Sequence, residues 1–426
     1  MKTLIKGGWV IDPANAIDGI KDILMENGVI KTVSADLNEP ADEVIDASGL
    51  YVLPGLVDMH CHLREPGYEY KEDIETGTKA AAKGGFTAVA CMPNTNPIVD
   101  NDSVVKYIVD KASRVASTRV YPIGSITKGA EGHQLAEMGF MKEAGAVAVS
   151  DDGKPVESSD VMRKAMEYSK DFGLLVISHC EDMKLSEGGT MNEGFLSTSL
   201  GLKGIPSLAE EIQVARDVLL SEYTGVSVHI AHISTGGSAR IIREAKKRGV
   251  RVTCETCPHY FSLTEDAVEG FDTNAKVNPP LRGENDRLAI IEAIKDGTVD
   301  AIATDHAPHH RDEKNVEFQY ASNGISGFET AYSAAYTYLV EPGHIKMDRL
   351  AELMSINPSR LLGKYSGGIK AGASADITIV DNSAKVIVNS DEFVSKGKNS
   401  PFSGKLLKGC IKFTIMDGIV RYREGE

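Results

Sequence analysis

The stretch Leu56-Val57-Asp58-Met59-His60-Cys61-His62 decides the expected fold. It is a short apolar run that ends on two histidines, which is typical of a buried strand that leads into a functional site. His60 and His62 stand two residues apart, so in an extended chain their side chains lie on the same face. One metal ion could therefore be held by both imidazoles, and the rest of the chain decides whether other ligands join them.

Seven more apolar runs follow this one, and helical patterns lie between them. The eight runs span Leu56–His60, Thr87–Met92, Arg119–Gly124, Ala146–Ser150, Leu174–His179, Ser227–His232, Arg251–Glu255 and Val299–Asp305. Alternating strands and helices predict a parallel sheet. Eight strands is the count of a (β/α)8 barrel, the TIM barrel, and exceeds that of a smaller doubly wound sheet. We therefore expect an α/β fold.

The clearest helical patterns span Ile74–Lys83, Val161–Asp171 and Ser207–Tyr223. In the third, Ser207 followed by Glu210 predicts a capping box at the helix start. Apolar residues recur there at helical spacing, at Leu208, Ile212, Ala215 and Leu219. The longer gap before the next strand leaves room for an inserted loop, Glu187–Pro206.

Both ends of the chain consist of short apolar pieces with turns between them. Asn27-Gly28 stands between two such pieces, and this dipeptide is a strong hairpin signal. The C-terminal pieces are Ala375–Val380, Val386–Val388 and Phe413–Val420. We expect residues 1–52 and 366–426 to fold together into one small β-sandwich, and residues 53–365 to form the barrel.

The composition excludes several classes of function. The net charge is −15, and an acidic chain repels phosphate backbones, so nucleic-acid binding is not expected. No run of about 18 apolar residues predicts a membrane span, and the first eight residues lack the apolar core of a signal peptide. The six cysteines are sparse and irregularly spaced, as expected of reduced thiols in a cytoplasmic protein.

Polar side chains of metal-binding type follow five of the eight predicted strands. They are His60, His62, Asp151, Asp152, His179, His232 and Asp305. In a (β/α)8 barrel these strand ends meet on one rim, where such enzymes keep their active sites. Imidazoles and carboxylates are typical zinc ligands. Two ions about 3.5–4 Å apart can share a hydroxide that attacks a carbonyl at neutral pH.

The histidines divide into two pairs. His60 and His62 could hold one ion, and His179 and His232 a second, with Asp152 or Asp151 as a bridge. Asp-Asp-Gly alone is usually a turn, but its position among these strand ends favours a metal site.

Other polar residues fit structural roles better. Cys254 and Cys257 have no second cysteine pair, so we expect neither a zinc ribbon nor a redox site. His229 lies three residues before His232 and is expected in the core. Lys396-Gly397-Lys398 is expected to be a solvated loop.

Several segments resemble dihydroorotases. Asp58–Gly67 is similar to the opening signature of that family. The later segments are Met92–Thr95, Ser150–Gly153, His179–Asp182, Ala231–Ser234, Val277–Arg282 and Ala303–His309. The resemblance covers essentially the whole chain. It implies a cyclic amide hydrolase that reversibly converts N-carbamoyl-L-aspartate to L-dihydroorotate in de novo pyrimidine biosynthesis.

The resemblance also implies roles for individual residues. The implied ligands of two zinc ions are His60, His62, Asp152, His179, His232 and Asp305. Class I members with Asp-Asp-Gly after the fourth strand are thought to use the second Asp where others use a carboxylated lysine. This favours Asp152 over Asp151 and leaves Lys154 without a ligand role.

The implied substrate contacts are His62, Arg64, Asn94, Asn278, His309, Asn323 and Gly324. The Arg64 guanidinium suits the substrate carboxylate, and Asn94 and His309 add donors to it. Asn278 and backbone amides fit the amide groups of the dihydroorotate ring. The implied catalytic residue is Asp305, which would pass a proton from the nucleophile to the leaving nitrogen.

One segment departs from the family pattern. The family usually has Pro-Phe-Gly before Ile-Ser-Gly, whereas Asn323 stands here where the family has an apolar residue. Backbone contacts from this loop do not depend on that side chain, but substrate packing does.

Two alternative functions share much of this pattern. A hydantoinase or allantoinase would have the same fold but typically carries the bridging lysine and lacks Met92-Pro93-Asn94-Thr95. A non-catalytic scaffold for aspartate transcarbamoylase would have no need of the full ligand set. A homodimer and a complex with aspartate transcarbamoylase are the candidate assemblies.

Overall fold

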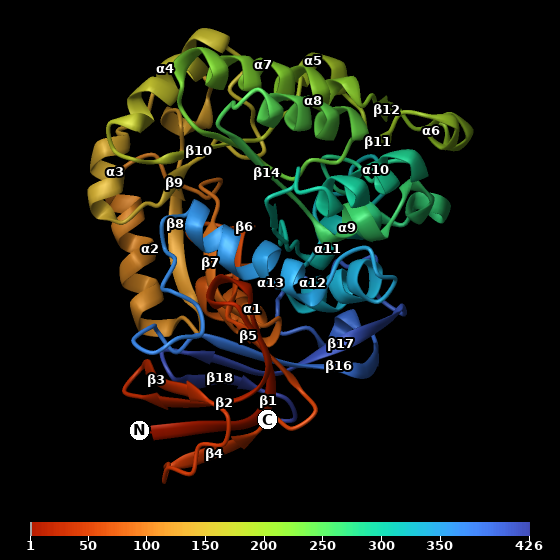
Figure 1. Cartoon of the computed structure of the whole chain (residues 1–426). Helices are drawn as coiled ribbons and strands as arrows, with labels where there is room; N and C mark the ends of the chain where they lie inside the picture. Colours follow the sequence, from red (N-terminus) through yellow and green to blue (C-terminus); the bar gives the residue numbers. More distant parts are fainter. Residues whose placement is uncertain (1) are drawn as a thin grey trace.

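Two eight-stranded sheets organise the computed structural model, which describes residues 2–426 (Figure 1). One sheet has the order β15-β14-β13-β10-β9-β8-β7-β6, and each strand in it is parallel to its neighbours. The other has the order β18-β17-β16-β5-β1-β2-β3, with β4 paired to β1. Residue 1, the start of the predicted range 1–52, lies outside the described residues.

The first sheet is the predicted barrel. Its strands are β6 (Leu56–Cys61), β7 (Phe86–Cys91), β8 (Arg119–Gly124), β9 (Ala148–Val149), β10 (Leu175–Ser178), β13 (Val228–Ile230), β14 (Val252–Thr256) and β15 (Ala301–Ile302). The two edge strands approach each other through a parallel bridge between Cys61 and His306. All neighbouring pairs are parallel, and each predicted run overlaps one of these strands, so the predicted fold class is confirmed.

Helices alternate with the barrel strands and cover the outside of the barrel (Figure 1). They are α1 (Ile74–Lys83), α2 (Asp102–Val115), α3 (Met138–Ala144), α4 (Ser159–Lys170), α5 (Met183–Ser186), α6 (Phe195–Leu200), α7 (Leu208–Thr224), α8 (Gly236–Lys247), α9 (Pro258–Ser262), α10 (Glu284–Lys295), α11 (Arg311–Lys314), α12 (Phe328–Ala335), α13 (Met347–Ala351) and α14 (Asn357–Leu361). Short strands β11 (Met191–Asn192) and β12 (Gly204–Ile205) flank α6 in the predicted insertion. Among residues 2–426, no helix is long and apolar enough to cross a membrane.

Helix α7 lies where it was predicted, but the prediction of a capping box at its start is wrong. Ser207 has helical backbone angles and its side chain caps nothing. The Glu210 carboxylate is buried and accepts hydrogen bonds from the backbone N–H groups of Ser234 (3.0 Å) and Thr235 (3.2 Å), in the loop after β13. Leu219, part of the predicted apolar pattern, is 61% exposed. The helix instead turns inward the face that carries Glu210, Val214 and Val218.

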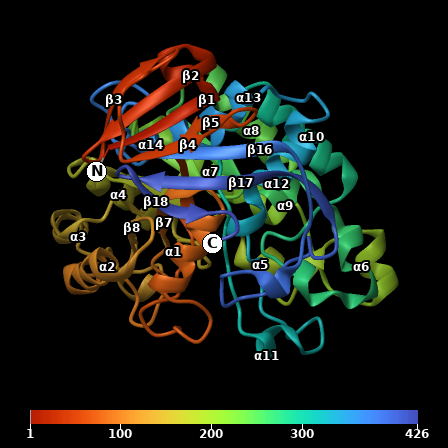
Figure 2. The same ribbon diagram turned by 90° about the horizontal axis from the view of Figure 1, so that it is seen from below.

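The second sheet joins the two ends of the chain. Its strands are β1 (Lys2–Asp12), β2 (Ile17–Glu26), β3 (Val29–Ser34), β4 (Glu43–Asp46), β5 (Tyr51–Pro54), β16 (Ile377–Ile387), β17 (Leu406–Met416) and β18 (Ile419–Arg423). The sheet lies beneath the barrel in Figure 1, and Figure 2, seen from below, shows strands from both ends of the chain side by side. Asn27 and Gly28 turn β2 into β3 with positive φ angles of 50° and 83°, as the Asn-Gly signal predicted. Residues Ile5, Ile23 and Ile415 belong to a hydrophobic core of the sheet's own.

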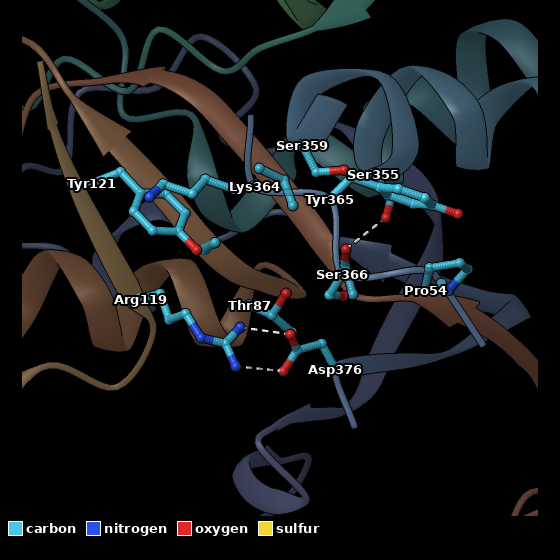
Figure 3. Close-up of a pocket in the computed structure, with 14 residues that line it drawn as sticks. Pro54, Thr87, Arg119, Tyr121, Ser355, Ser359, Lys364, Tyr365, Ser366 and Asp376 are labelled. Atoms are coloured by element: carbon cyan, nitrogen blue, oxygen red, sulfur yellow. Dashed lines mark hydrogen bonds and ion pairs between the residues drawn. The ribbon is translucent and has the colours of Figure 1, made fainter. Parts of the chain in front are cut away.

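An ion pair ties this sheet to the bottom of the barrel, opposite the predicted active-site rim. Arg119 at the start of β8 donates two hydrogen bonds to the Asp376 carboxylate, at 2.5 and 3.0 Å (Figure 3). They lie beside a cavity of about 40 Å³, whose walls also include Lys364 and Tyr365. The amino-terminal ends of the barrel strands are thus used for contacts that hold the terminal sheet to the barrel.

The segment between β16 and β17 corrects another expectation. It leaves the sheet and runs along the barrel, with Ser395, Asn399 and Ser400 all at least 97% buried. Lys396 forms an ion pair with Asp73 at the start of α1. The predicted solvated loop around Lys396-Gly397-Lys398 is therefore only partly right: Lys396 is exposed, but Gly397 and the residues that flank the lysines are buried against the barrel.

Candidate active site

The six predicted metal ligands meet at the carboxyl ends of the barrel strands, and all are buried. His60 lies on β6 and His62 follows it, and the others follow β9, β10, β13 and β15. His60 Nε2 lies 3.3 Å from Asp152 Oδ1, and His62 Nε2 lies 3.1 Å from Asp305 Oδ1. Residues up to 245 positions apart in the chain thus form one cluster, as the barrel prediction required.

The cluster contains two overlapping sets of ligand atoms, each within 4.8 Å of one another. One set is His60, His62 and Asp305, and the other is His60, Asp152 and His232. The Asp152 carboxylate lies between the histidines of the two sets. Its Oδ1 is 3.6 Å from both His179 Nδ1 and His232 Nε2, while its Oδ2 is 3.5 Å from His62 Nε2. A carboxylate in this place can contact ions on both sides.

Asp151 is also buried but points away from the cluster. Its Oδ1 accepts hydrogen bonds from the backbone N–H groups of Ile126 (2.7 Å) and Thr127 (3.1 Å). Burial raises the pKa of Asp151 to about 6, although these hydrogen bonds oppose the shift. Asp151 therefore fastens the loop after β8, and Asp152 is the aspartate that faces the histidines.

Three of the four histidines donate one ring N–H outward and turn the other nitrogen to the cluster. His60 Nδ1 donates to Glu255 Oε1 (2.7 Å), His62 Nδ1 to Asn94 Oδ1 (2.8 Å) and His179 Nε2 to Glu181 Oε2 (3.0 Å). Metal-binding histidines are commonly oriented in this way by a carboxylate or carbonyl group.

The donor atoms fit a metal centre. His60 Nε2 and Asp152 Oδ1 lie 3.3 Å apart, and both are buried without a hydrogen-bond partner among the described residues. Buried polar atoms are nearly always paired, so two unpaired ones that face each other fit a bound cation. Burial alone would lower the pKa of His179, but Asp152 and Glu181 outweigh it and raise the pKa to about 10. The site thus favours positive charge.

Glu255 and Glu181 are site residues that the sequence reasoning missed. Glu255, on β14, is completely buried, and its second oxygen accepts a hydrogen bond from His229 Nε2 (3.3 Å). Burial would raise the pKa of Glu255, but His60 and His229 lower it to about 2, so it is a carboxylate. A charged residue at the end of a predicted barrel strand was the available signal. His229 lies in the core, as predicted.

Glu255→Ala is expected to lower metal affinity by roughly 10- to 100-fold, because His60 loses the acceptor that fixes its ring. Metal content after dialysis against increasing chelator measures this effect. Glu157→Ala, at an exposed site after β9, is the control and should retain metal like the unmodified protein. Equal metal retention by Glu255→Ala would contradict the orienting role.

A cavity of about 190 Å³ opens beside the cluster, and all seven predicted substrate residues line it. They are His62, Arg64, Asn94, Asn278, His309, Asn323 and Gly324. Asn94 also donates to Asp152 Oδ2 (3.3 Å), and Asn278 donates to Glu181 Oε2 (2.9 Å). These two amides thus connect the cavity wall to the groups that surround the cluster.

Arg64 and His309 also line this cavity. Arg64 Nε donates to Pro308 O (3.2 Å), and no carboxylate among residues 2–426 forms an ion pair with its guanidinium. Burial and the nearby charges of Arg64 and Lys71 lower the pKa of His309 to about 3, so its ring is neutral at pH 7. His309 Nε2 donates to Asn323 O (2.8 Å). An unpaired arginine beside neutral donors can receive a carboxylate.

Three non-glycine residues of the site have positive φ angles: Arg64 (62°), His232 (32°) and Asp305 (45°). Such angles are unfavourable for residues with a Cβ and persist only where the surrounding structure imposes them. Each follows a barrel strand, so the backbone turns sharply where it aims a side chain into the site.

Comparison with known proteins identifies relatives over the full length. Residues 49–238 match the family model described as dihydro-orotase-like. The chain is 60% identical over 421 residues to a dihydroorotase of Acetivibrio thermocellus, covering 99% of each chain. It is 58% identical over 426 residues to a dihydroorotase of Geobacter sulfurreducens, covering 100% of each.

Solved structures with the same fold include an L-hydantoinase (dihydropyrimidinase) from Arthrobacter aurescens. It has a TM-score of 0.90 and 25% sequence identity, with 100% of this chain and 96% of the hydantoinase covered. A dihydropyrimidinase from Brevibacillus agri has a TM-score of 0.86 at 24% identity, with 100% and 96% covered. The second supports the fold alone.

Proposed function

Because this chain belongs to the dihydroorotase family, we propose that it is a dihydroorotase. It would reversibly cyclise N-carbamoyl-L-aspartate to L-dihydroorotate, in de novo pyrimidine biosynthesis. One observation carries the proposal: a cluster of four histidines and two aspartates shares a cavity with the unpaired Arg64. The cluster, once loaded with metal, can activate an amide carbonyl. Arg64 can bind the carboxylate that N-carbamoyl-L-aspartate and L-dihydroorotate both carry.

We assign the chain to class I, with Asp151-Asp152-Gly153 as its bridging motif and Asp152 as the bridge. One zinc ion would be held by His60, His62 and Asp305, and a second by His179 and His232. When bound, the ions would acidify water and polarise the scissile carbonyl. The central place of the Asp152 carboxylate supports this arrangement.

The cavity wall would bind and orient the substrate. The Arg64 guanidinium would form a charge-assisted pair with the substrate carboxylate, and the Asn94 amide would add a donor. His309 is neutral, so its role is that of a hydrogen-bond partner. Asn278 and the backbone at Asn323 and Gly324 would contact the ring amides. His62 borders both the cluster and the cavity.

Asp305 would move the proton. Burial raises the pKa of this carboxyl, but the hydrogen bond with His62 and the charges of His60 and His62 bring it below its ordinary value. It is therefore a carboxylate able to accept a proton. During ring opening Asp305 would take a proton from the attacking water and deliver it to the leaving ring nitrogen. Cyclisation reverses these transfers.

Arg64→Ala is expected to raise the KM for L-dihydroorotate by roughly 10- to 100-fold, the usual cost of losing a charged hydrogen bond. Metal content should not change, because Arg64 touches none of the ligands. Arg311→Ala provides a control on the same rim, since Arg311 is exposed and outside the cavity. An unchanged KM in Arg64→Ala would refute the assignment to the substrate carboxylate.

The competing activity is that of a hydantoinase, the class of the structural neighbours. Initial rates with L-dihydroorotate, hydantoin, allantoin and dihydrouracil, measured on the same zinc-loaded sample, distinguish the two. We expect turnover of L-dihydroorotate above that of the other three. Preference for hydantoin or dihydrouracil would instead assign the chain to the neighbours' activity, and metal without any turnover would favour the scaffold.

We further propose that residues 1–52 and 366–426 form one module and residues 53–365 the catalytic barrel. Homodimer formation, binding to aspartate transcarbamoylase and a cytoplasmic location remain predictions.

A further inference from the structure

Lys314, the last residue of α11, is a buried cation without a carboxylate partner. Its side chain is 95% buried, and Nζ donates to the backbone carbonyls of Lys276 (3.2 Å), Ser322 (2.7 Å) and Gly324 (3.0 Å). No ion pair involves Lys314 anywhere in residues 2–426. An ammonium group has three protons, so these carbonyls satisfy it completely.

Burying this cation costs free energy, and burial lowers the pKa of Lys314 to about 7, with the charge of Lys276 adding to the shift. A chain optimised only for stability would place an apolar side chain there. What the ammonium group provides is three simultaneous hydrogen bonds to two loops that carry substrate residues.

Asn399 makes a second set of contacts to the same region. It lies on the segment between β16 and β17 and is 97% buried. Its Oδ1 accepts hydrogen bonds from His309 N (3.0 Å) and Ser326 Oγ (3.0 Å), and its Nδ2 donates to Ala307 O (3.1 Å) and Gly324 O (2.9 Å). A single amide from the C-terminal part of the chain thus links two loops of the barrel rim.

Both side chains converge on one atom, the carbonyl oxygen of Gly324. The backbone there is held tightly: φ is +149°, and a Cβ would lie 2.5 Å from Ala307 O and 3.0 Å from His309 Cδ2. Gly324 N also donates to Lys276 O (3.0 Å). The three segments joined in this way carry Asn278, His309 and Asn323.

We propose that Lys314 and Asn399 are positioning residues that fix the relative positions of the three substrate-binding loops around the cavity. This inference rests on the proposed function, because it assigns a purpose to the contacts that hold the predicted substrate residues of the cavity. Neither residue lines that cavity, so each acts through the loops that it binds. Small misplacements of substrate-binding groups are enough to weaken catalysis.

The test compares Lys314→Met and Asn399→Ala with the unmodified zinc-loaded enzyme. We expect each to raise the KM for L-dihydroorotate on the order of tenfold, the cost of about one charge-assisted hydrogen bond. The turnover number should fall less than the KM rises, and metal content should be unchanged, because the cluster is untouched.

Two matched controls separate positioning from general stability. Lys246→Met removes a lysine that donates to Thr298 O (2.7 Å) and Asp300 Oδ2 (2.6 Å) at the far end of β15. Asn382→Ala removes a buried amide of the terminal sheet that accepts from the Tyr332 hydroxyl (2.6 Å). Both should lower the melting temperature and leave the KM as it was.

The double variant Lys314→Met with Asn399→Ala adds a further check. Because both residues donate to the same carbonyl, their effects on KM should combine to less than the product of the single effects. A full product would show that the two residues act independently and would overturn the shared clamp at Gly324.

Other outcomes are also decisive. If the unmodified enzyme opens L-dihydroorotate and both single variants keep its KM, the positioning role is wrong. If Lys314→Met fails to fold, Lys314→Gln, which keeps two N–H donors, should show a smaller rise in KM, and no rise would overturn the inference. If the unmodified, zinc-loaded protein has no turnover, the proposed function fails instead.

Discussion

Asp305→Asn is expected to lower the turnover number by about 10⁴-fold, the upper range for losing a general acid–base group. Asparagine keeps the shape of the side chain but cannot accept the proton that ring opening releases. The position also contributes to the first set of ligand atoms, with Oδ1 3.1 Å from His62 Nε2. Asp305→Ala, which removes both oxygens, should in addition weaken metal binding.

Steady-state rates and metal content of the same samples test this prediction. Asp300→Asn is a matched control just before the same strand, where the carboxylate binds Lys246 Nζ (2.6 Å) and Cys254 N (2.8 Å). It should affect stability and leave the turnover number almost unchanged. Near-normal turnover by Asp305→Asn would remove this residue from the proton pathway.

Asp152→Ala should eliminate turnover and lower the metal content, whereas Asp151→Ala should retain the metal. The difference follows from their directions: Asp152 lies among four histidines, while Asp151 accepts backbone hydrogen bonds from Ile126 and Thr127. Loss of Asp151 leaves those buried N–H groups unpaired, which costs about 1–3 kcal/mol each.

Metal analysis and thermal unfolding of the two variants are the measurement. We expect Asp152→Ala to be folded and poor in metal, and Asp151→Ala to hold metal but unfold at a lower temperature. The reverse pattern would make Asp151 the bridge and would contradict the structural assignment.

The barrel was predictable because its signals are local. Each strand is a short apolar run, and each ends where its polar residue begins, so the sequence positions of His60, His179 and Asp305 already imply a shared rim. The terminal sheet was predictable for a similar reason, since the Asn27-Gly28 turn specifies its hairpin by conformational preference alone.

The supporting contacts could not be predicted, because they join distant parts of the chain. Glu255 meets His60 across 195 positions, and Asn399 meets His309 across 90. No local pattern encodes such a pair. The same limit explains the exposed Leu219 of α7: Glu210 contacts the loop after β13, and Val214 and Val218 are buried on the same face, so that face turns inward.

The charges of the site also follow from the fold. The chain has a net charge of −15, yet the cavity beside the cluster is lined by Arg64, which has no carboxylate partner in the described residues. We therefore expect a carboxylate substrate to be attracted by local positive charge in the site rather than by the surface as a whole.

The most direct test of the account is ultraviolet absorbance during ring opening of L-dihydroorotate, with metal content determined on the same sample. The account predicts turnover that disappears when a chelator removes the metal and returns when zinc is added. Folded protein that holds zinc at the predicted content but opens no L-dihydroorotate would contradict the assigned reaction. Folded protein that binds no zinc would contradict the metal centre itself.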